Sequence, residues 1–168
     1  MDATFVADEA RTAIDFRDFV ELARYRAAHS PALPVYTFVR GSERRAHVLT
    51  CAELDRRARA LAAVLARETS IGARALLLFE PGIEYIVALF GCMYAGVIAV
   101  PAYPIEPAQA ERTARRLAGI VEDSRPAALL TTSASMERLA DMSASIAGLD
   151  QPSWIAVDSL GEAEATPV

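Results

Sequence analysis

The stretch Leu89-Phe-Gly-Cys-Met-Tyr-Ala-Gly-Val-Ile-Ala-Val-Pro-Ala-Tyr-Pro-Ile105 decides the fold class of this chain. Its first part continues a segment from Ile83 that is apolar nearly all round, which predicts a helix over 83–95 with neighbours on several sides. Gly96 stands where a left-handed residue would end that helix. The run from Val97 to Val100 stops at a proline and is typical of a short buried strand. The stretch therefore predicts a buried helix that leads directly into a buried strand.

The same alternation continues on both sides of this stretch. Short apolar runs predict strands at 75–79, 127–131 and 154–157, and amphipathic segments predict helices at 108–124 and 133–147. Strands that alternate with helices are the pattern of a mostly parallel sheet with helical crossovers. We therefore expect an α/β domain over residues 1–160, followed by an acidic loop or tail over 161–168.

The first fifty residues have a different pattern. Apolar positions at helical spacing predict a helix over 15–28, and two β-rich runs at 35–40 and 46–50 flank Gly41-Ser42 and predict a hairpin. Thr50-Cys-Ala-Glu53 has the form of a capping box, in which the threonine hydroxyl accepts a hydrogen bond from a free amide at a helix start. A helix should therefore begin directly after the hairpin.

Composition excludes several classes of function. The chain has 168 residues and a net charge of −5, which disfavours nucleic acid and anionic lipid surfaces as partners. All 17 basic residues are arginine, so the chain offers no lysine ammonium group. The longest uncharged run, Tyr85 to Ile105, is interrupted by glycines and prolines, and its helical part is too short for a transmembrane segment.

The two cysteines and the N-terminus indicate in which cellular compartment the protein acts. Cys51 and Cys92 lie in helical segments with no Cys or His at ligand spacing, which favours packed, reduced thiols over a metal site. The N-terminus carries early acidic residues and no long apolar core, unlike a signal peptide. We therefore expect a cytoplasmic protein without a metal site.

Candidate binding residues follow the predicted strands. Glu80-Pro-Gly-Ile-Glu84 comes directly after the strand at 75–79, at the edge where open α/β sheets bind ligands. The sequence contains neither G-x-G-x-x-G nor G-x-x-x-x-G-K, and Gly82 is interpreted as a residue that permits the turn. Arg138 lies on the helix after the strand at 127–131, from which it could reach a phosphate at the same edge.

Two further groups of residues each allow two interpretations: an aromatic residue with its neighbouring proline, and a cluster of arginines. Tyr103 and Pro104 follow the strand at 97–100 and would form either a rigid ligand-facing platform or a stiff exposed loop. Glu111 is placed to pair with Arg115, which favours a solvated helix face over a binding site for the arginine cluster at Arg112, Arg115 and Arg116.

An aromatic and aliphatic stripe on the predicted helix over 83–95 could line an acyl tunnel, or it could pack in the core; its members are Tyr85, Leu89, Phe90 and Met93. His29 and His47 have no Ser, Cys or acidic partner at a spacing that indicates a catalytic triad. Both histidines are therefore treated as ordinary residues.

The pattern G-C-x-Y-A-G-V-x-A-V-P-x-Y-P over Gly91 to Pro104 resembles a core motif of the adenylate-forming acyl and aminoacyl ligases, in the form typical of fatty-acyl-AMP ligases. The segments 49–61 and 75–82 resemble the preceding blocks of these enzymes, in the same order. The resemblance covers about 38–132 and implies that the chain is the N-terminal portion of such a ligase.

The resemblance also implies an activity and its partners. The parent enzyme would use ATP and Mg²⁺ to activate a fatty acid as an acyl adenylate, and would pass the acyl group to an acyl carrier protein, often in polyketide or nonribosomal peptide biosynthesis. In coenzyme A-using relatives, the positions of Tyr103, Pro104 and Arg138 lie near the acceptor nucleotide, so the resemblance implies that these residues face the acceptor.

Enzymes of this family carry a phosphate loop that ends in lysine, an acidic residue that holds the ribose and a catalytic lysine, none of which this sequence matches. We therefore expect that the chain by itself has no catalytic residue, binds neither ATP nor Mg²⁺ tightly, and self-associates through exposed apolar surface. A fragment of an acyl-CoA ligase and a free-standing, non-catalytic α/β module that binds a ligand or partner are the alternatives.

Overall fold

A computed structural model of the chain describes residues 15–40, 45–103, 110–143 and 146–160. Pro104 and the expected tail over 161–168 lie outside the described residues. Within the described ranges, no helix combines the length and the apolar character that crossing a bilayer requires.

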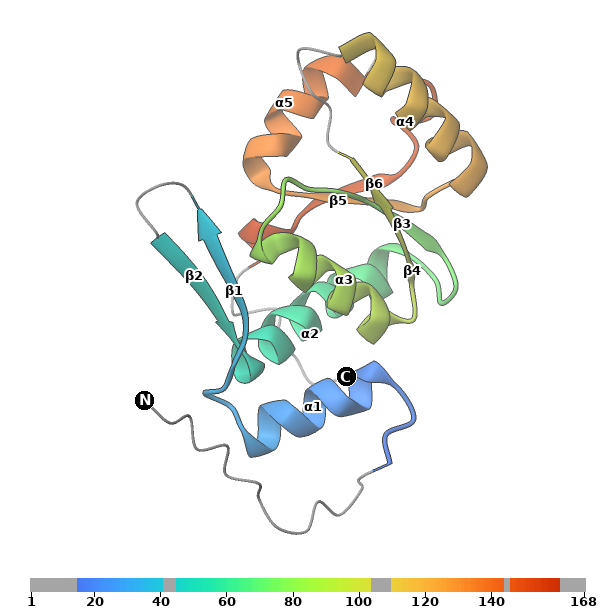
Figure 1. Ribbon diagram of the computed structural model, residues 1–168. Helices are drawn as coiled ribbons and strands as arrows, with labels where there is room; N and C mark the ends of the chain where they lie inside the picture. The colour runs from blue at the N-terminus through green and yellow to red at the C-terminus, as the bar shows by residue number, and fades with distance from the viewer. Residues whose placement is uncertain (1–14, 41–44, 104–109, 144–145, 161–168) are drawn as a thin grey trace.

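A four-stranded parallel sheet forms the centre of the molecule (Figure 1). Its strands are β3 (Arg74–Leu78), β4 (Ile98–Ala102), β5 (Ala128–Thr131) and β6 (Ser153–Ala156), in the spatial order β4-β3-β5-β6. Each neighbouring pair is parallel. The structure therefore confirms the predicted α/β fold with helical crossovers.

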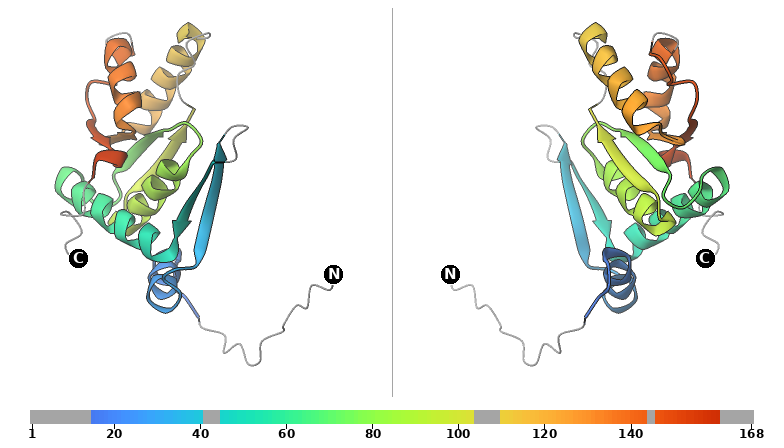
Figure 2. Two further views of the ribbon diagram at one scale, coloured as in Figure 1. Left: turned by 90° about the vertical axis from the view of Figure 1, so that its left-hand side faces the viewer. Right: turned by 90° about the vertical axis from the view of Figure 1, so that its right-hand side faces the viewer.

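Helices cover both faces of this sheet (Figures 1 and 2). Helices α2 (Cys51–Glu68) and α3 (Ile83–Ala95) lie on one face, and α4 (Ala110–Ser124) and α5 (Ser133–Ser143) lie on the other. Strand β3 sends Ala75 and Leu77 into the core under α2 and α3, and Leu76 and Leu78 into the core under α4 and α5. Burial on both faces explains why this strand is a continuous apolar run rather than an alternating one.

Helix α3 is apolar all round because it packs against α2 on one side and the sheet on another. Gly91 permits the close approach of the two helices, since a Cβ there would lie 2.5 Å from Leu61 Cδ2. Gly96 ends the helix in the left-handed conformation, with a φ of 67°, as predicted.

The N-terminal elements lie beside this body (Figure 2). They are helix α1 (Phe19–His29) and an antiparallel hairpin of β1 (Pro34–Arg40) and β2 (Arg45–Thr50). The Thr50 hydroxyl accepts a hydrogen bond from the Glu53 amide at 3.3 Å, so the predicted cap begins α2. Leu49 is fully buried and anchors the hairpin to the core.

Two predicted helix boundaries are wrong. Helix α1 begins at Phe19 rather than Asp15, because the Asp18 carboxylate accepts from the Glu21 amide at 2.8 Å and caps the helix there. Helix α5 ends at Ser143 rather than Ala147. Ile146 and Leu149 are nevertheless buried, because the chain turns at Gly148, which has a φ of 78°.

Candidate functional site

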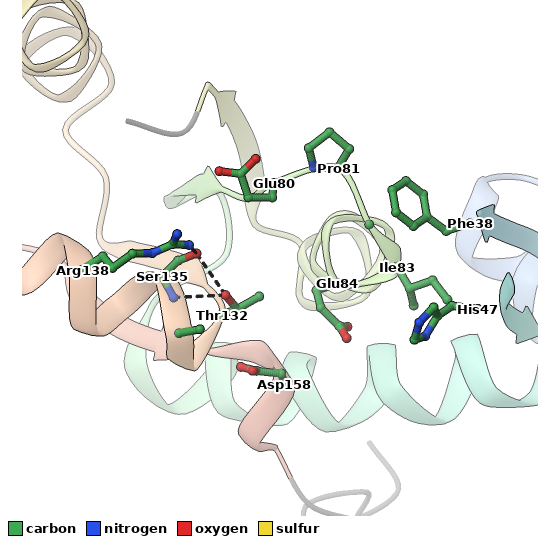
Figure 3. A pocket seen from close by; sticks show the side chains of 12 residues that line it. Phe38, His47, Glu80, Pro81, Ile83, Glu84, Thr132, Ser135, Arg138 and Asp158 are labelled. Carbon is green, nitrogen blue, oxygen red and sulfur yellow. Dashed lines mark hydrogen bonds between the residues drawn. The ribbon is translucent and has the colours of Figure 1, made fainter. Parts of the chain in front are cut away.

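A pocket of about 340 Å³ opens at the carboxyl edge of the sheet (Figure 3). From β3 the chain crosses to β4 on one side of β3, and it later crosses to β5 on the other side, so the direction in which strands are added to the sheet reverses between β3 and β5. Open α/β sheets bind ligands at such a switch point, outside the carboxyl ends of the strands. The pocket lies there, between the segments that follow β3 and β5, with the hairpin as its third wall.

The wall that follows β5 carries Arg138. Thr132 caps the start of α5 by accepting from the Ser135 amide at 3.3 Å. The Ser135 hydroxyl in turn accepts from Thr132 Oγ1 and from Arg138 Nη2, each at 3.1 Å. The structure therefore places Arg138 at the sheet edge where the sequence predicts it, with its guanidinium oriented by a serine.

Asp158 closes the same wall from the end of β6. One oxygen of its carboxylate accepts from the Ser133 amide at 2.7 Å and from the Ser133 hydroxyl at 3.0 Å. A carboxylate at a helix start satisfies amides that have no partner within the helix. Asp158 therefore joins the end of β6 to the start of α5.

The wall that follows β3 is the predicted segment Glu80–Glu84. Glu84, in the first turn of α3, forms an ion pair with Arg57 of α2. Gly82 has an extended backbone with a φ of 173°, and a Cβ there would meet only the Glu80 carbonyl oxygen at 3.8 Å. Gly82 is thus compatible with the turn, as interpreted, but the turn does not depend on glycine, because any residue adopts this extended conformation without strain.

The hairpin contributes Phe38 and His47, which are direct cross-strand partners. Sequence reasoning set His47 aside, and it also missed Phe38, Thr132, Ser135 and Asp158. Thr132 and Asp158 could have been found as the first hydroxyl and the first carboxyl group after β5 and β6, and Ser135 as a hydroxyl in the first turn of the following helix. No local signal in the sequence brings a hairpin to this edge.

Tyr103 lies elsewhere. It follows β4, its side chain is 74% exposed, and the Arg116 guanidinium lies 4.8 Å from the centre of its ring. Tyr103 does not line the pocket that holds Arg138. The predicted Glu111–Arg115 pair is present at 3.5 Å between two exposed side chains, as expected for a solvated face.

The apolar stripe of α3 packs mainly inward. Tyr85, Leu89 and Phe90 are partly buried against the core under α2 and α3, and the Tyr85 ring meets Phe79 edge-on at 6.4 Å. Met93 is 38% exposed. The four stripe residues do not line the pocket at the sheet edge.

The thiols are buried, as predicted. Cys51 is 3% exposed and Cys92 is fully buried, and neither forms a disulfide. Burial raises the pKa of the Cys92 thiol to about 12. Cys92 is therefore an inert core residue at neutral pH.

The described residues do not fit a complete site for ATP and Mg²⁺. Among them there is no cluster of three or more His, Cys, Asp or Glu side chains that could hold a metal ion. The sequence has no lysine to bind a transferred phosphate, and the carboxylates of Asp158 and Glu84 are engaged with Ser133 and Arg57. Arg138 is the cation that the pocket offers to an anionic group.

Comparison with known proteins identifies the family. The family model for AMP-binding enzymes matches residues 23–167. JamA of Moorena producens (strain JHB), a medium-chain-fatty-acid–[acyl-carrier-protein] ligase, is 35% identical over 147 residues, which are 87% of this chain and 25% of JamA.

Two solved structures agree with this match. A fatty acid AMP ligase from Legionella pneumophila has a TM-score of 0.77 at 32% identity, over 96% of this chain and 27% of the ligase. A fatty acyl-adenylate ligase from L. pneumophila, in complex with acyl adenylate and pyrophosphate, has a TM-score of 0.73 at 34% identity, over 89% of this chain and 25% of the ligase. This chain spans about a quarter of the length of these relatives. It therefore belongs to the AMP-binding enzyme family, and its sequence and fold match part of the N-terminal domain of the fatty-acyl-AMP ligases.

Proposed function

We propose that this chain is part of an ATP-dependent fatty-acyl-AMP ligase, which activates a fatty acid as an acyl adenylate and transfers the acyl group to an acyl carrier protein. The observation that carries the proposal is the match to a fatty acid AMP ligase over 96% of the chain at 32% identity. The ligation of fatty acids to a carrier protein by JamA, a relative at 35% identity, supports the carrier as the acceptor. The enzyme would act in the cytoplasm.

Arg138 is the residue of this chain that we assign to the acceptor. It lies in a pocket at the sheet edge, and Ser135 orients its guanidinium. A guanidinium suits a phosphate, because its donors match two phosphate oxygens at once. Tyr103 and Pro104 would border the acceptor from the end of β4. The stripe of Tyr85, Leu89, Phe90 and Met93 would face the acyl chain.

ATP, with Mg²⁺, would supply the adenylyl group of the intermediate. Because this chain has no lysine and its described residues form no metal cluster, the remaining three-quarters of the ligase would hold both. The chain by itself would be inactive, since electrostatic stabilisation of the transferred group is the largest contribution to catalysis in most enzymes.

An acceptor assay tests the proposal. The full-length parent, supplied with ATP and fatty acid, should charge a carrier protein and use coenzyme A poorly. Replacing Arg138 with Ala should slow transfer to the carrier about tenfold while leaving adenylate formation unchanged, because the charge-assisted contact of the guanidinium with the acceptor is lost. The matched control, Arg26→Ala, removes an exposed arginine from α1 and should change neither step.

Each other outcome rejects a defined part of the proposal. Efficient formation of acyl-coenzyme A would assign the chain to an acyl-CoA ligase. Unchanged transfer by the Arg138→Ala variant would remove Arg138 from the acceptor site. A coding sequence that ends after Val168 would favour the non-catalytic module.

A further inference from the structure

The β1–β2 hairpin has one face that is turned to the body. Cross-strand partners in an antiparallel pair share a face, so the register places Tyr36 with Leu49 and Phe38 with His47 on the same side. Leu49 is fully buried, and Phe38 and His47 line the pocket at the sheet edge. This inner face is therefore both an anchor and a wall of the candidate site.

The opposite face, which we call the outer face, consists of Thr37, Val39, Ala46 and Val48. All four residues are exposed, with Val39 at 56% and Val48 at 45%. A hairpin with one solvated face normally carries polar side chains there. Valine and threonine on the outer face, with apolar residues also on the inner face, are instead typical of strands that are covered on both sides.

The edges of the hairpin are open as well. Within the described residues, β1 pairs only with β2, so each strand has one edge without a backbone partner. A two-stranded hairpin is marginally stable by itself, and edge strands in natural proteins are protected by charge, proline or a covering element. On the outer face, Val39 and Val48 are neither charged nor proline, and both side chains are exposed.

We propose that the outer face of the hairpin is an interface, covered in the intact protein by an apolar surface from the remainder of the ligase. This inference rests on the proposed function. The matched relatives are about four times as long as this chain, since it covers 25% of JamA and 27% of the Legionella ligase. The remainder is therefore large enough to supply the cover, and a contiguous exposed apolar surface marks such a contact.

The cover has a consequence for the pocket. Phe38 and His47 project from the same two strands as Val39 and Val48, on the opposite side. Whatever holds the outer face in place also fixes the position of the inner one, because the two share one backbone. The cover would therefore also help to hold the pocket wall formed by Phe38 and His47, which Leu49 anchors from the inner face.

Cysteine labelling tests the interface directly. Val39→Cys and Val48→Cys variants are prepared in residues 1–168 and in the full-length parent, and the rate of maleimide labelling at each site is followed by peptide mass spectrometry. The native thiols give a low background, because Cys51 and Cys92 are buried. The matched control is Ile71→Cys, at a residue that is 87% exposed and lies at the opposite edge of the sheet.

We expect both hairpin cysteines to label at least about tenfold more slowly in the parent than in dilute residues 1–168, with no change at position 71. Equal labelling in the two proteins overturns the proposal, as does a coding sequence that ends after Val168. Protection in the parent that disappears on dilution would overturn the proposal as well, because a second copy and not the remainder of the ligase would then cover the face.

Fatty-acid-dependent pyrophosphate exchange, measured on the same unlabelled parent, separates this inference from the proposed function. Slow labelling without exchange rejects the ligase activity and keeps the interface. Exchange without protection rejects the interface and keeps the activity.

Discussion

At the scale of single residues, Gly91 permits the close approach of α2 and α3. A Cβ at position 91 would lie 2.5 Å from Leu61 Cδ2 and 3.0 Å from Leu61 Cβ, so rotation of the leucine side chain cannot remove the contact. Replacing Gly91 with Ala should lower the free energy of unfolding by about 1–3 kcal/mol, through overpacking of this interface. Urea denaturation followed by circular dichroism measures the change.

Gly119 provides the matched control. It also lies inside a helix, α4, but a Cβ there would meet nothing within 4 Å. Replacing Gly119 with Ala should raise the free energy of unfolding by about 0.5–1 kcal/mol, because alanine loses less conformational entropy on folding. Equal effects of the two substitutions would contradict this account of the α2–α3 contact.

Tyr94 connects α3 to α2 through a polar contact. Its hydroxyl donates to Asp55 Oδ1 at 2.7 Å, and Asp55 Oδ2 accepts from Arg59 Nε at 2.7 Å. Burial and the hydrogen bond to Asp55 raise the pKa of Tyr94 above its usual range. The folded protein therefore holds this proton more tightly than the unfolded chain does, and stability should fall as the pH rises above about 10, the pKa of an unperturbed tyrosine.

The Tyr94→Phe variant should lose about 1 kcal/mol at neutral pH and should show a weaker decline in stability above pH 10. The exposed Tyr103 is the control, and Tyr103→Phe should change neither quantity. Thermal unfolding across the alkaline range decides the matter. If the stability of the Tyr94→Phe variant falls above pH 10 as steeply as that of the wild-type protein, the decline does not come from the Tyr94 hydroxyl.

At the scale of secondary-structure elements, the Arg57–Glu84 ion pair connects the middle of α2 to the first turn of α3. The two side chains are 20% and 31% exposed, so solvent screens their attraction only partly. A double-mutant cycle with Arg57→Ala and Glu84→Ala should give a coupling energy of about 1 kcal/mol. The cycle at Arg115 and Glu111, which are 82% and 91% exposed, should give a value close to zero. A larger coupling energy for Arg115 and Glu111 than for Arg57 and Glu84 would contradict the inference that the Arg57–Glu84 pair positions α3.

The order and type of these elements could be predicted because each has a local cause. The apolar run 75–78 is a strand covered on both faces, the left-handed Gly96 ends α3, and the Thr50 hydroxyl caps α2. The candidate site could be predicted only in part. Arg138 and the segment 80–84 follow strands, and that position indicates the binding edge.

The rest of the site depends on contacts between distant parts of the chain. Phe38 and His47 reach the pocket because of the register of the hairpin and because Leu49 is buried. The register and this burial leave no periodic signal in the sequence. The Tyr103 ring lies against Arg116 and outside the pocket that holds Arg138. Sequence position at the end of a strand does not determine the direction of an exposed side chain.

At the scale of the whole molecule, the exposed outer face of the hairpin predicts that the isolated chain self-associates. Open strand edges and apolar side chains invite pairing with a second copy. Multi-angle light scattering over a dilution series should give a mass above the 18.1 kDa of one chain at high concentration. The Val48→Asp variant should remain monomeric, because a charge on the outer face opposes the contact. A monomeric wild-type chain at every concentration would indicate a self-sufficient domain.

The central claim is that this chain is one part of a fatty-acyl-AMP ligase and that the adenylation chemistry lies in the remainder. Fatty-acid-dependent exchange of pyrophosphate with ATP, measured side by side for the full-length parent and for residues 1–168, tests it most directly. The account predicts exchange by the parent, and no exchange above the buffer control by residues 1–168. Turnover by residues 1–168 that persists through rigorous purification, or a parent that forms no acyl adenylate with any fatty acid, would contradict it.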